Sequence, residues 1–352
     1  MDMFITFAGT AASVPTAARG TAATLLSRGG ERWLVDCGEG TQRQLLRSGL
    51  GLADLDLVLL THLHGDHYLG LPGLLKTFGL RGRERPLLVI GPRGLVRLME
   101  TLAPVIGRLP YPVDMEEVGG GGPETAWAGD GFHIGAFPTR HSIASVGYVL
   151  AEEDRPGAFD IAAARALGVP EGPAFGVLQR GGEVTTPDGR VVRPAEVLGA
   201  PRPGRVVVLS GDTEPCDATR DAARGASGLV HEATFLDEDR ARARETRHTT
   251  AREAAELGRD ADVALLVLTH LSSRFAPREV RAEATAVFDR VLVPRDFDQV
   301  EVPFPERGAP IVHPVRTRRD EPAGVPAADA AGEPEGDAPP GPGPRDGAVG
   351  AT

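Results

Sequence analysis

The chain has 352 residues, of which 41% are hydrophobic, and its formal net charge is −11. This length and composition allow a sizeable core in one large or two ordinary domains, and the negative charge excludes a surface that attracts polyanions over its whole extent. No apolar run approaches the ~20 residues of a membrane span, and residues 1–9 lack the basic start of a secretory signal. We therefore expect a soluble, cytoplasmic protein in which Cys37 and Cys216 are isolated thiols.

The first half of the chain alternates short apolar runs with helical patterns and glycine-rich turns. Apolar residues at helical spacing predict helices at 41–48, 71–78 and 94–103. Such alternation is typical of the α/β class. In chain order, the apolar runs predict strands at 4–7, 23–26, 33–35, 57–60, 87–90 and 132–136.

The second half contains an insertion and a tail. Residues 152–203 are polar and rich in Gly and Pro, with one short helical piece at 161–167, which indicates an insertion outside the main core. From residue 320 the chain is dominated by Ala, Gly and Pro, with seven acidic residues and one arginine. We expect a domain at 1–319 that includes the insertion, and a disordered acidic tail at 320–352. Between these parts, strands are predicted at 205–209, 229–234 and 263–268, and helices at 250–257 and 277–287.

The most informative motif is THLHGDH at residues 61–67, which directly follows the apolar run 57–60. It places His62, His64, Asp66 and His67 at the end of a predicted strand, where sites are commonly built. Imidazole suits zinc, and a carboxylate also accepts manganese or iron. Three histidines and an aspartate this close together can supply most ligands of two divalent metals.

Three further candidate ligands also follow predicted strands: His141, Asp212 and His270. Because strand ends on one edge of a sheet can converge on one cleft, we expect them to join the motif. The set contains no thiolate, which argues against a structural zinc site. Two metals held ~3.5–4 Å apart activate water and clamp the oxygens of a phosphodiester, so the predicted chemistry is hydrolysis.

The motif THLHGDH, followed by a late aspartate and a late histidine, resembles the metallo-β-lactamase superfamily. The resemblance implies an αβ/βα sandwich with the metals at one edge of two sheets. Thioesterases, lactonases, phosphodiesterases and nucleases of that superfamily use nearly the same ligands, so the ligands alone leave the substrate open.

Further segments are similar to one branch of the superfamily, the ribonuclease Z family of tRNA 3′-processing endonucleases. The similarity covers roughly residues 3–303. One departure lies at 15–20, where the lysine and asparagine of the family's loop are absent, which puts the handling of the CCA end in question. The matching segments are DCGEGTQRQ at 36–44, GLPGLL at 70–75, GDT at 211–213, HEAT at 231–234, and HTT at 248–250 in place of the usual His-Ser-Thr.

This resemblance implies a zinc enzyme with two zinc ions per subunit and manganese as an alternative metal. Asp66 would also be the general base, while Glu232 and His248 would form the pair that protonates the leaving 3′-oxygen. Arg274 is a candidate phosphate contact. The implied metal ligands are His62, His64 and His141 for one ion, Asp66, His67 and His270 for the other, and Asp212 as the bridge.

The insertion at 152–203 resembles the protruding flexible arm, or exosite, with which the family grips tRNA. Gly172 and Pro173 match the Gly-Pro motif of that arm. The family is usually a homodimer in which the arm of one subunit serves the active site of the other. The implied partner is precursor tRNA, and no membrane is involved.

The leading hypothesis is an endoribonuclease that removes the 3′ trailer from precursor tRNA. One alternative is a small-molecule metallohydrolase of the same superfamily, such as a phosphodiesterase or lactonase; the arm and the Glu232–His248 pair count against it. A second alternative is a catalytically inactive RNA-binding protein, against which the complete ligand set counts.

Overall fold

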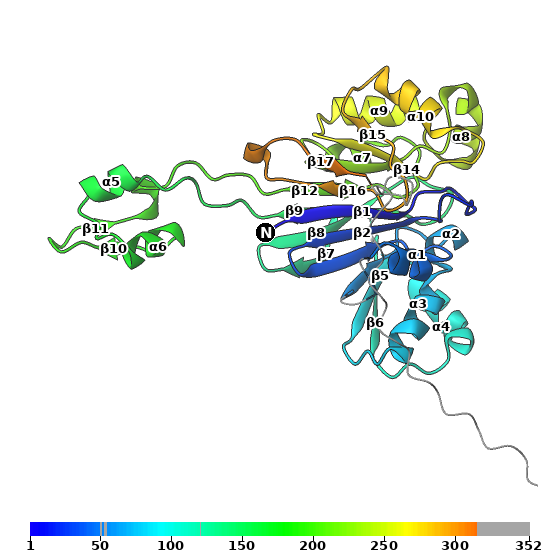
Figure 1. The fold of residues 1–352 in the computed structure, drawn as a ribbon, viewed down its shortest axis with the longest axis horizontal. Coiled ribbons are helices and arrows are strands. Elements are labelled where there is room, and N and C mark those ends of the chain that lie inside the picture. Colours follow the sequence, from blue (N-terminus) through cyan, green and yellow to red (C-terminus); the bar gives the residue numbers. More distant parts are fainter. Residues whose placement is uncertain (50, 53–54, 120, 315–352) are drawn as a thin grey trace, which may run out of the picture. The chain divides into compact units, whose positions relative to one another are not determined.

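The computed structural model describes residues 1–49, 51–52, 55–119 and 121–314, so the predicted tail at 320–352 lies outside the described residues. Figure 1 shows two sheets packed face to face, with helices outside them. Among the described residues, no helix has the length and apolar character that crossing a membrane requires.

The first sheet contains, within the described residues, eight strands in the order β17-β16-β1-β2-β3-β4-β5-β6. Strands β3, β4 and β5 run parallel, so their carboxyl ends share one edge. The strands of this sheet are β1 (Met3–Gly9), β2 (Ala23–Arg28), β3 (Glu31–Val35), β4 (Leu57–Leu59), β5 (Leu87–Pro92), β6 (Val113–Val118), β16 (Gln299–Glu301) and β17 (Ile311–His313).

The second sheet has, in the part of the chain that the structure describes, seven strands in the order β15-β14-β13-β12-β9-β8-β7. Strands β12, β13 and β14 are parallel, and their carboxyl ends also meet at one edge. The bounds are β7 (Glu124–Gly129), β8 (Phe132–Pro138), β9 (Val146–Glu152), β12 (Val206–Leu209), β13 (Gly228–Glu232), β14 (Leu266–Thr269) and β15 (Val291–Leu292).

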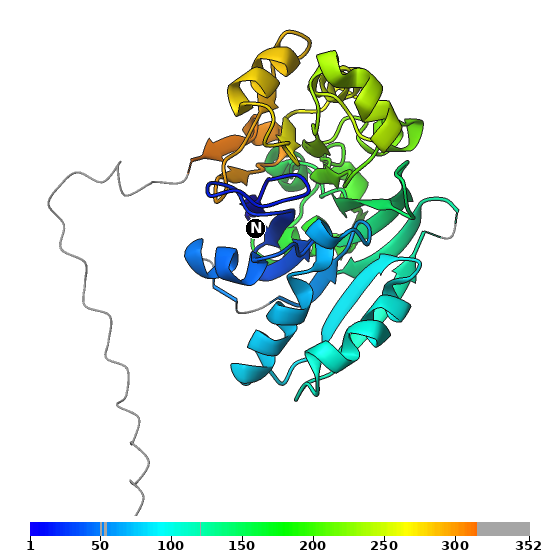
Figure 2. The same ribbon diagram turned by 90° about the vertical axis from the view of Figure 1, so that its right-hand side faces the viewer.

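Three apolar layers hold the sandwich together. Between the sheets, Ile5 and Trp33 of the first sheet belong to the same buried cluster as Tyr148 and Val207 of the second. Separate clusters lie under the helices on each outer face, which Figure 2 shows in blue to cyan on one side and yellow-green to gold on the other. The helices are α1 (Thr41–Arg47), α2 (Gly65–Tyr68), α3 (Leu71–Leu80) and α4 (Leu95–Ile106) on the first sheet, and α7 (Asp217–Ala222), α8 (Arg240–Thr246), α9 (Ala251–Asp260) and α10 (Pro277–Thr285) on the second.

This architecture confirms the predicted αβ/βα sandwich. The predicted helices at 41–48, 71–78, 94–103, 250–257 and 277–287 begin within one residue of the observed ones. The apolar pattern did not predict β6, because four of its six residues Val113–Val118 are exposed and an edge strand needs few apolar side chains. Helix α9 begins with a capping box in which Thr250 and Glu253 bond each other's backbone N–H.

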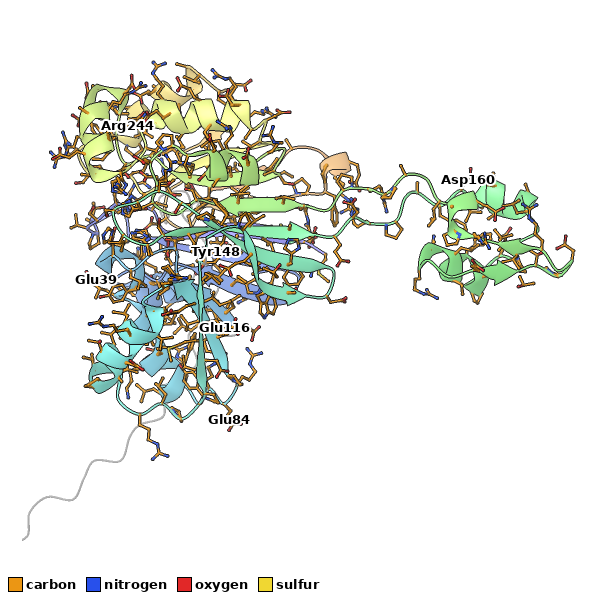
Figure 3. The ribbon with its side chains drawn as sticks, turned by 180° about the vertical axis from the view of Figure 1, so that it is seen from behind. Glu39, Glu84, Glu116, Tyr148, Asp160 and Arg244 are labelled. Carbon is orange, nitrogen blue, oxygen red and sulfur yellow. The ribbon has the colours of Figure 1, made fainter. Side chains whose placement is uncertain are left out.

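Residues 152–203 leave the second sheet after β9 and return before β12. They form a small module with its own apolar cluster, in which Ala164, Val169 and Leu178 are buried. Figure 1 shows this module beyond the sheets, at the end of two extended segments, and Figure 3 labels Asp160, which caps its first helix. Its elements are α5 (Ile161–Ala166), α6 (Pro173–Gln179), β10 (Val184–Thr185), β11 (Val191–Val192) and the 3-10 turn η1 (Pro194–Glu196).

Candidate metal centre

The histidines and aspartates of the predicted ligand set meet at the edge where the parallel strands of both sheets end. His62 follows β4, and Asp212 and His270 follow β12 and β14. His141 follows β8, which runs in the same direction as β12 because both pair antiparallel with β9. The turn from β4 into α2 adds the rest of the motif, so all seven predicted ligands come together.

One group of donors consists of His62, His64 and His141. The Nδ1 atom of His64 lies 3.0 Å from Nε2 of His62 and 3.1 Å from Nε2 of His141. Three ring nitrogens at these separations surround a single point, as ligands of one ion with metal–nitrogen bonds of ~2.0–2.1 Å do.

A second group consists of Asp66, His67 and His270. The Nε2 atoms of the two histidines are 3.4 Å apart, and Asp66 Oδ2 lies 3.2 Å from Nε2 of His270 and 3.5 Å from Nε2 of His67. The backbone N–H of Ser13 donates to Asp66 Oδ2 at 2.8 Å and holds that carboxylate in place.

Asp212 lies between the two groups. Its Oδ2 atom is 3.7 Å from Nε2 of His62 on one side, and 3.5 and 3.2 Å from Nε2 of His67 and His270 on the other. With only 3% of its surface exposed, this carboxylate is surrounded by the donors of both groups. Its position fits a ligand shared by two ions.

The ring nitrogens that face away from the two donor groups indicate whether these histidines fit metal ions. The Nδ1–H of His141 donates to the carbonyl oxygen of Arg247 at 3.0 Å, which leaves its Nε2 as a lone pair facing the group. His67 Nδ1 bonds Asp36 Oδ2 at 2.9 Å, and His270 Nδ1 bonds the hydroxyl of Thr234 at 2.9 Å. Partners of this kind fix the tautomer and orientation of metal-ligating histidines. The donor set therefore fits two divalent ions.

Electrostatics favour neutral imidazoles in the first group. Burial lowers the pKa of His62 well below its ordinary value, and burial also lowers the pKa of His64 and of His141. Burial opposes charge on His67 too, but the carboxylates of Asp212 and Asp36 outweigh it and raise that pKa. Neutral rings with free lone pairs are the form that binds metals.

The aspartates of the centre remain ionised. Burial alone would raise the pKa of Asp66, but hydrogen bonds from His270 and His67 lower it. Burial likewise opposes charge on Asp212, but its electrostatic interactions with His270 and His67 lower its pKa well below the ordinary value. Both carboxylates can therefore act as anionic ligands.

Beside the ligands, Glu232 holds His248. Glu232 Oε1 accepts a hydrogen bond from His248 Nδ1 at 2.8 Å and another from the backbone N–H of Thr213 at 2.8 Å. Its other oxygen accepts from the hydroxyl of Thr234 at 2.6 Å. Burial would lower the pKa of His248, but the Glu232 carboxylate raises it to about 9. This ring is therefore in its positively charged form, with both nitrogens protonated, at neutral pH.

Three other predicted site residues lie outside the ligand set. Arg274, the candidate phosphate contact, is paired with Asp239 at 2.7 Å, so its guanidinium is already engaged. Gly172 and Pro173 lie on the exposed surface of the arm, where Pro173 begins α6.

The residues that orient the ligands were not predicted from the sequence. Asp36 and Thr61 form one such pair, because Asp36 Oδ1 accepts from the backbone N–H of Thr61 at 2.8 Å while Oδ2 holds His67. Arg247 is another orienting residue, because its Nη1 donates to the carbonyl oxygen of His141 at 2.9 Å. The available signals were that Asp36 begins the family-like segment 36–44, that Thr61 begins the motif 61–67, and that Arg247 precedes the predicted site residue His248.

Comparisons with known proteins agree with this geometry. The family model described as the metallo-beta-lactamase superfamily matches residues 17–154. The chain is 48% identical to a ribonuclease Z of Haloferax volcanii over 308 residues, which cover 86% of this chain and 96% of that protein. It is 48% identical to a ribonuclease Z of Myxococcus xanthus over 271 residues, covering 77% of this chain and 87% of the relative.

Solved structures show the same fold. The short form of human tRNase Z has 27% sequence identity and a TM-score of 0.63, with 85% of this chain and 99% of that chain covered. The metallo-beta-lactamase fold protein YhfI of Bacillus subtilis has 20% identity and a TM-score of 0.61, with 86% and 100% covered, which supports the fold alone. With a complete His/Asp ligand set at the edge of an αβ/βα sandwich, and with relatives this similar over most of its length, the chain belongs to the ribonuclease Z family of endoribonucleases.

Proposed function

We propose that the protein removes the 3′ trailer from precursor tRNA by hydrolysis at a centre of two zinc ions per subunit. The observation that carries this proposal is one edge of the fold where seven candidate metal ligands lie beside the Glu232–His248 pair. Membership of the ribonuclease Z family supports the substrate class.

The two groups of donors define which residues would hold each ion. His62, His64 and His141 would hold one, and Asp66, His67 and His270 the other, with Asp212 shared between them. When bound, two such ions activate a water molecule and neutralise charge on the scissile phosphate.

Proton transfer is the task of two side chains. Asp66, ionised and held by Ser13, would accept a proton from the attacking water, whose oxygen forms the new bond to phosphorus. The bond from phosphorus to the 3′-oxygen breaks, and His248 would give that oxygen a proton. Because Glu232 holds Nδ1 of His248, the other ring nitrogen is the one available to donate. The products are a 3′-hydroxyl on the tRNA and a 5′-phosphate on the trailer.

The arm would supply the grip on tRNA. Gly172 and Pro173 lie on its exposed surface, away from the metal centre, as a contact to a distant part of a folded RNA requires. We propose that the protein is a homodimer in which each arm serves the centre of the partner subunit.

The test is cleavage of a 3′-extended precursor tRNA by the full chain with zinc or manganese, followed by analysis of the product ends. We expect a 3′-hydroxyl and a 5′-phosphate, with cleavage abolished by Asp66→Ala. If the wild type hydrolyses bis-para-nitrophenyl phosphate but leaves precursor tRNA intact across salts and metals, the protein is a small-molecule phosphodiesterase instead.

A further inference from the structure

The two segments that join the arm to the second sheet, residues 153–156 and 202–205, form what we call the neck. The backbone N–H groups of Arg155 and Arg202 donate to each other's carbonyl oxygens at 2.7 and 2.8 Å. Their side chains repeat this exchange, since Arg155 Nη2 donates to Pro203 O at 3.2 Å and Arg202 Nε donates to Pro156 O at 3.0 Å. These four bonds make the two segments a single paired unit.

A buried ion cluster fixes the base of the neck in the sandwich. Glu152, the last residue of β9, accepts hydrogen bonds from Arg205 through both oxygens, each at 2.7 Å, and from Arg28 Nε at 2.8 Å. The side chains of Arg205 and Glu152 are only 1% and 5% exposed. Arg205 Nη1 also donates to the carbonyl oxygen of Val302, which follows β16. The base of the neck is therefore tied to both sheets.

The turn between β16 and β17, which contains η3 (Pro305–Arg307), contacts the neck further out. The ring of Phe304 lies under the guanidinium of Arg155, with 3.5 Å from Cζ to the ring centroid, and under that of Arg205 at 4.1 Å. Figure 1 shows this turn in orange beside the two green segments of the neck.

Glu306 on the same turn bridges both segments of the neck. Its Oε2 atom lies 2.8 Å from Nη2 of Arg155, and its Oε1 atom lies 3.7 Å from Nη1 of Arg202. The hydrogen bond from Arg155 lowers the pKa of Glu306 to about 2, so the carboxylate is charged at neutral pH. One turn thus contacts both segments of the neck at the place where the arm leaves the domain.

We propose that Phe304 and Glu306, which we call the brace, are positioning residues for precursor tRNA: they fix the direction of the arm relative to the metal centre. The inference rests on the function proposed above, in which the arm grips tRNA. A prearranged link between two binding surfaces reduces the entropy lost when both engage one ligand. A small phosphodiester contacts the metal centre alone, so the brace should not affect its hydrolysis.

The test compares Glu306→Ala and Phe304→Leu with the wild type on precursor tRNA and on bis-para-nitrophenyl phosphate. We expect KM for precursor tRNA to rise roughly five- to tenfold in each variant. Without the brace the arm is free to move, and it then loses that conformational freedom when tRNA binds. Hydrolysis of the small diester should stay within about twofold of wild type, since the small diester does not contact the arm and its binding does not require the arm to become ordered. Phe304→Tyr, which keeps the ring under the two guanidiniums, should restore KM.

Glu301→Gln is the matched control. Glu301 lies on the same hairpin and pairs with His313 at 3.1 Å, but it makes no contact with the neck in the described structure. Glu306 is 39% exposed, so its removal should alter stability little, and a change in KM will not reflect unfolding.

A spectroscopic measurement gives a second readout. Spin labels at Asp188→Cys in the arm and Glu116→Cys on β6, in a Cys216→Ser background, report the distance between arm and domain. We expect the distance distribution to broaden in Glu306→Ala and to remain as in wild type in Glu301→Gln.

An unchanged KM for precursor tRNA in both Glu306→Ala and Phe304→Leu would overturn the proposal. That outcome differs from a failure of the proposed function, in which the wild-type protein itself would not cleave precursor tRNA.

Discussion

At the scale of single residues, the metal centre depends on side chains that are not ligands themselves. Asp36 is held in the left-handed region, with a φ of 60°, directly after β3. Aspartate tolerates this conformation better than most residues. In this position one carboxylate joins the backbone of Thr61 to the ring of His67, and so it aligns the start of the motif with one of its ligands.

Asp36→Asn should weaken metal binding by about 10–100-fold, because the amide cannot fix the His67 ring as a carboxylate does. Competition of the purified protein with a chelator of known affinity measures this change. Asp114→Asn, on the exposed strand β6, is the control and should bind metal as the wild type does. Equal metal affinity in the two variants would show that Asp36 does not orient the ligand.

Glu232→Gln tests the assignment of His248 as the acid. The amide no longer stabilises the protonated ring, so kcat for precursor tRNA should fall by roughly 10²- to 10⁴-fold. Hydrolysis of bis-para-nitrophenyl phosphate should fall much less, because its phenolate leaves without a proton. An equal loss on both substrates would mean that Glu232 supports the metal centre rather than the leaving group.

The candidate ligands could be predicted from the sequence because they follow strands whose apolar runs are evident. The orienting residues could not, because their roles depend on pairing across the sheets. Arg247, for example, contacts His141 from 106 positions away in the chain. The ion pair between Arg274, the candidate phosphate contact, and Asp239 is likewise not marked by any local pattern.

At the scale of elements, close backbone contacts hold the metal motif against its neighbouring loop. The N–H of Cys37 donates to the carbonyl oxygen of His67 at 2.7 Å, and the N–H of Gly70 donates to the carbonyl oxygen of Cys37 at 2.9 Å. A Cβ atom at Gly70 would lie 2.0 Å from the carbonyl oxygen of Gly38. Only glycine allows α3 to begin this close to the loop.

Gly70→Ala should therefore destabilise the protein by about 2 kcal/mol or more, since a backbone atom and not a flexible side chain must move. Chemical denaturation with metal present measures the free energy of unfolding. Gly73→Ala in the same helix is the matched control, because its Cβ would meet only the end of the Gln42 side chain. Equal losses in both variants would contradict the steric explanation.

The buried cluster of Glu152, Arg205 and Arg28 should contribute to stability in a pH-dependent way. Burial alone would raise the pKa of Glu152, but hydrogen bonds from Arg205 and Arg28 lower it to about 2 from 4.5. The folded-state pKa is thus depressed, so this stabilisation is fully present above pH 4.5 and is lost as the pH falls towards 2.

Glu152→Gln should cost roughly 3 kcal/mol at neutral pH, because it leaves buried arginine charge uncompensated. The difference in unfolding free energy between wild type and variant should shrink as the pH falls towards about 2. A difference that stays constant over that range would show that ionised Glu152 is not its source.

At the scale of the whole molecule, the strand-end ligands account for the metal centre of the proposed function, and the insertion at 152–203 accounts for its arm. Strand periodicity predicts the α/β class and the strand-end ligands predict the metal centre, since both depend on local patterns, whereas the αβ/βα sandwich is implied by the resemblance to the superfamily. The composition of 152–203 indicated an insertion, but the contacts of the neck with Phe304 and Glu306 were not predictable. They join residues about 100 to 150 positions apart, and no local pattern marks them.

The most direct test of the account replaces the arm. Residues 155 and 202 already pair as antiparallel neighbours, so a two-residue glycine-containing turn can join them in place of 156–201. The variant and the wild type are then assayed side by side on precursor tRNA and on bis-para-nitrophenyl phosphate. We predict that the variant keeps small-diester hydrolysis and loses tRNA cleavage. Cleavage of precursor tRNA at the wild-type rate without the arm would contradict it.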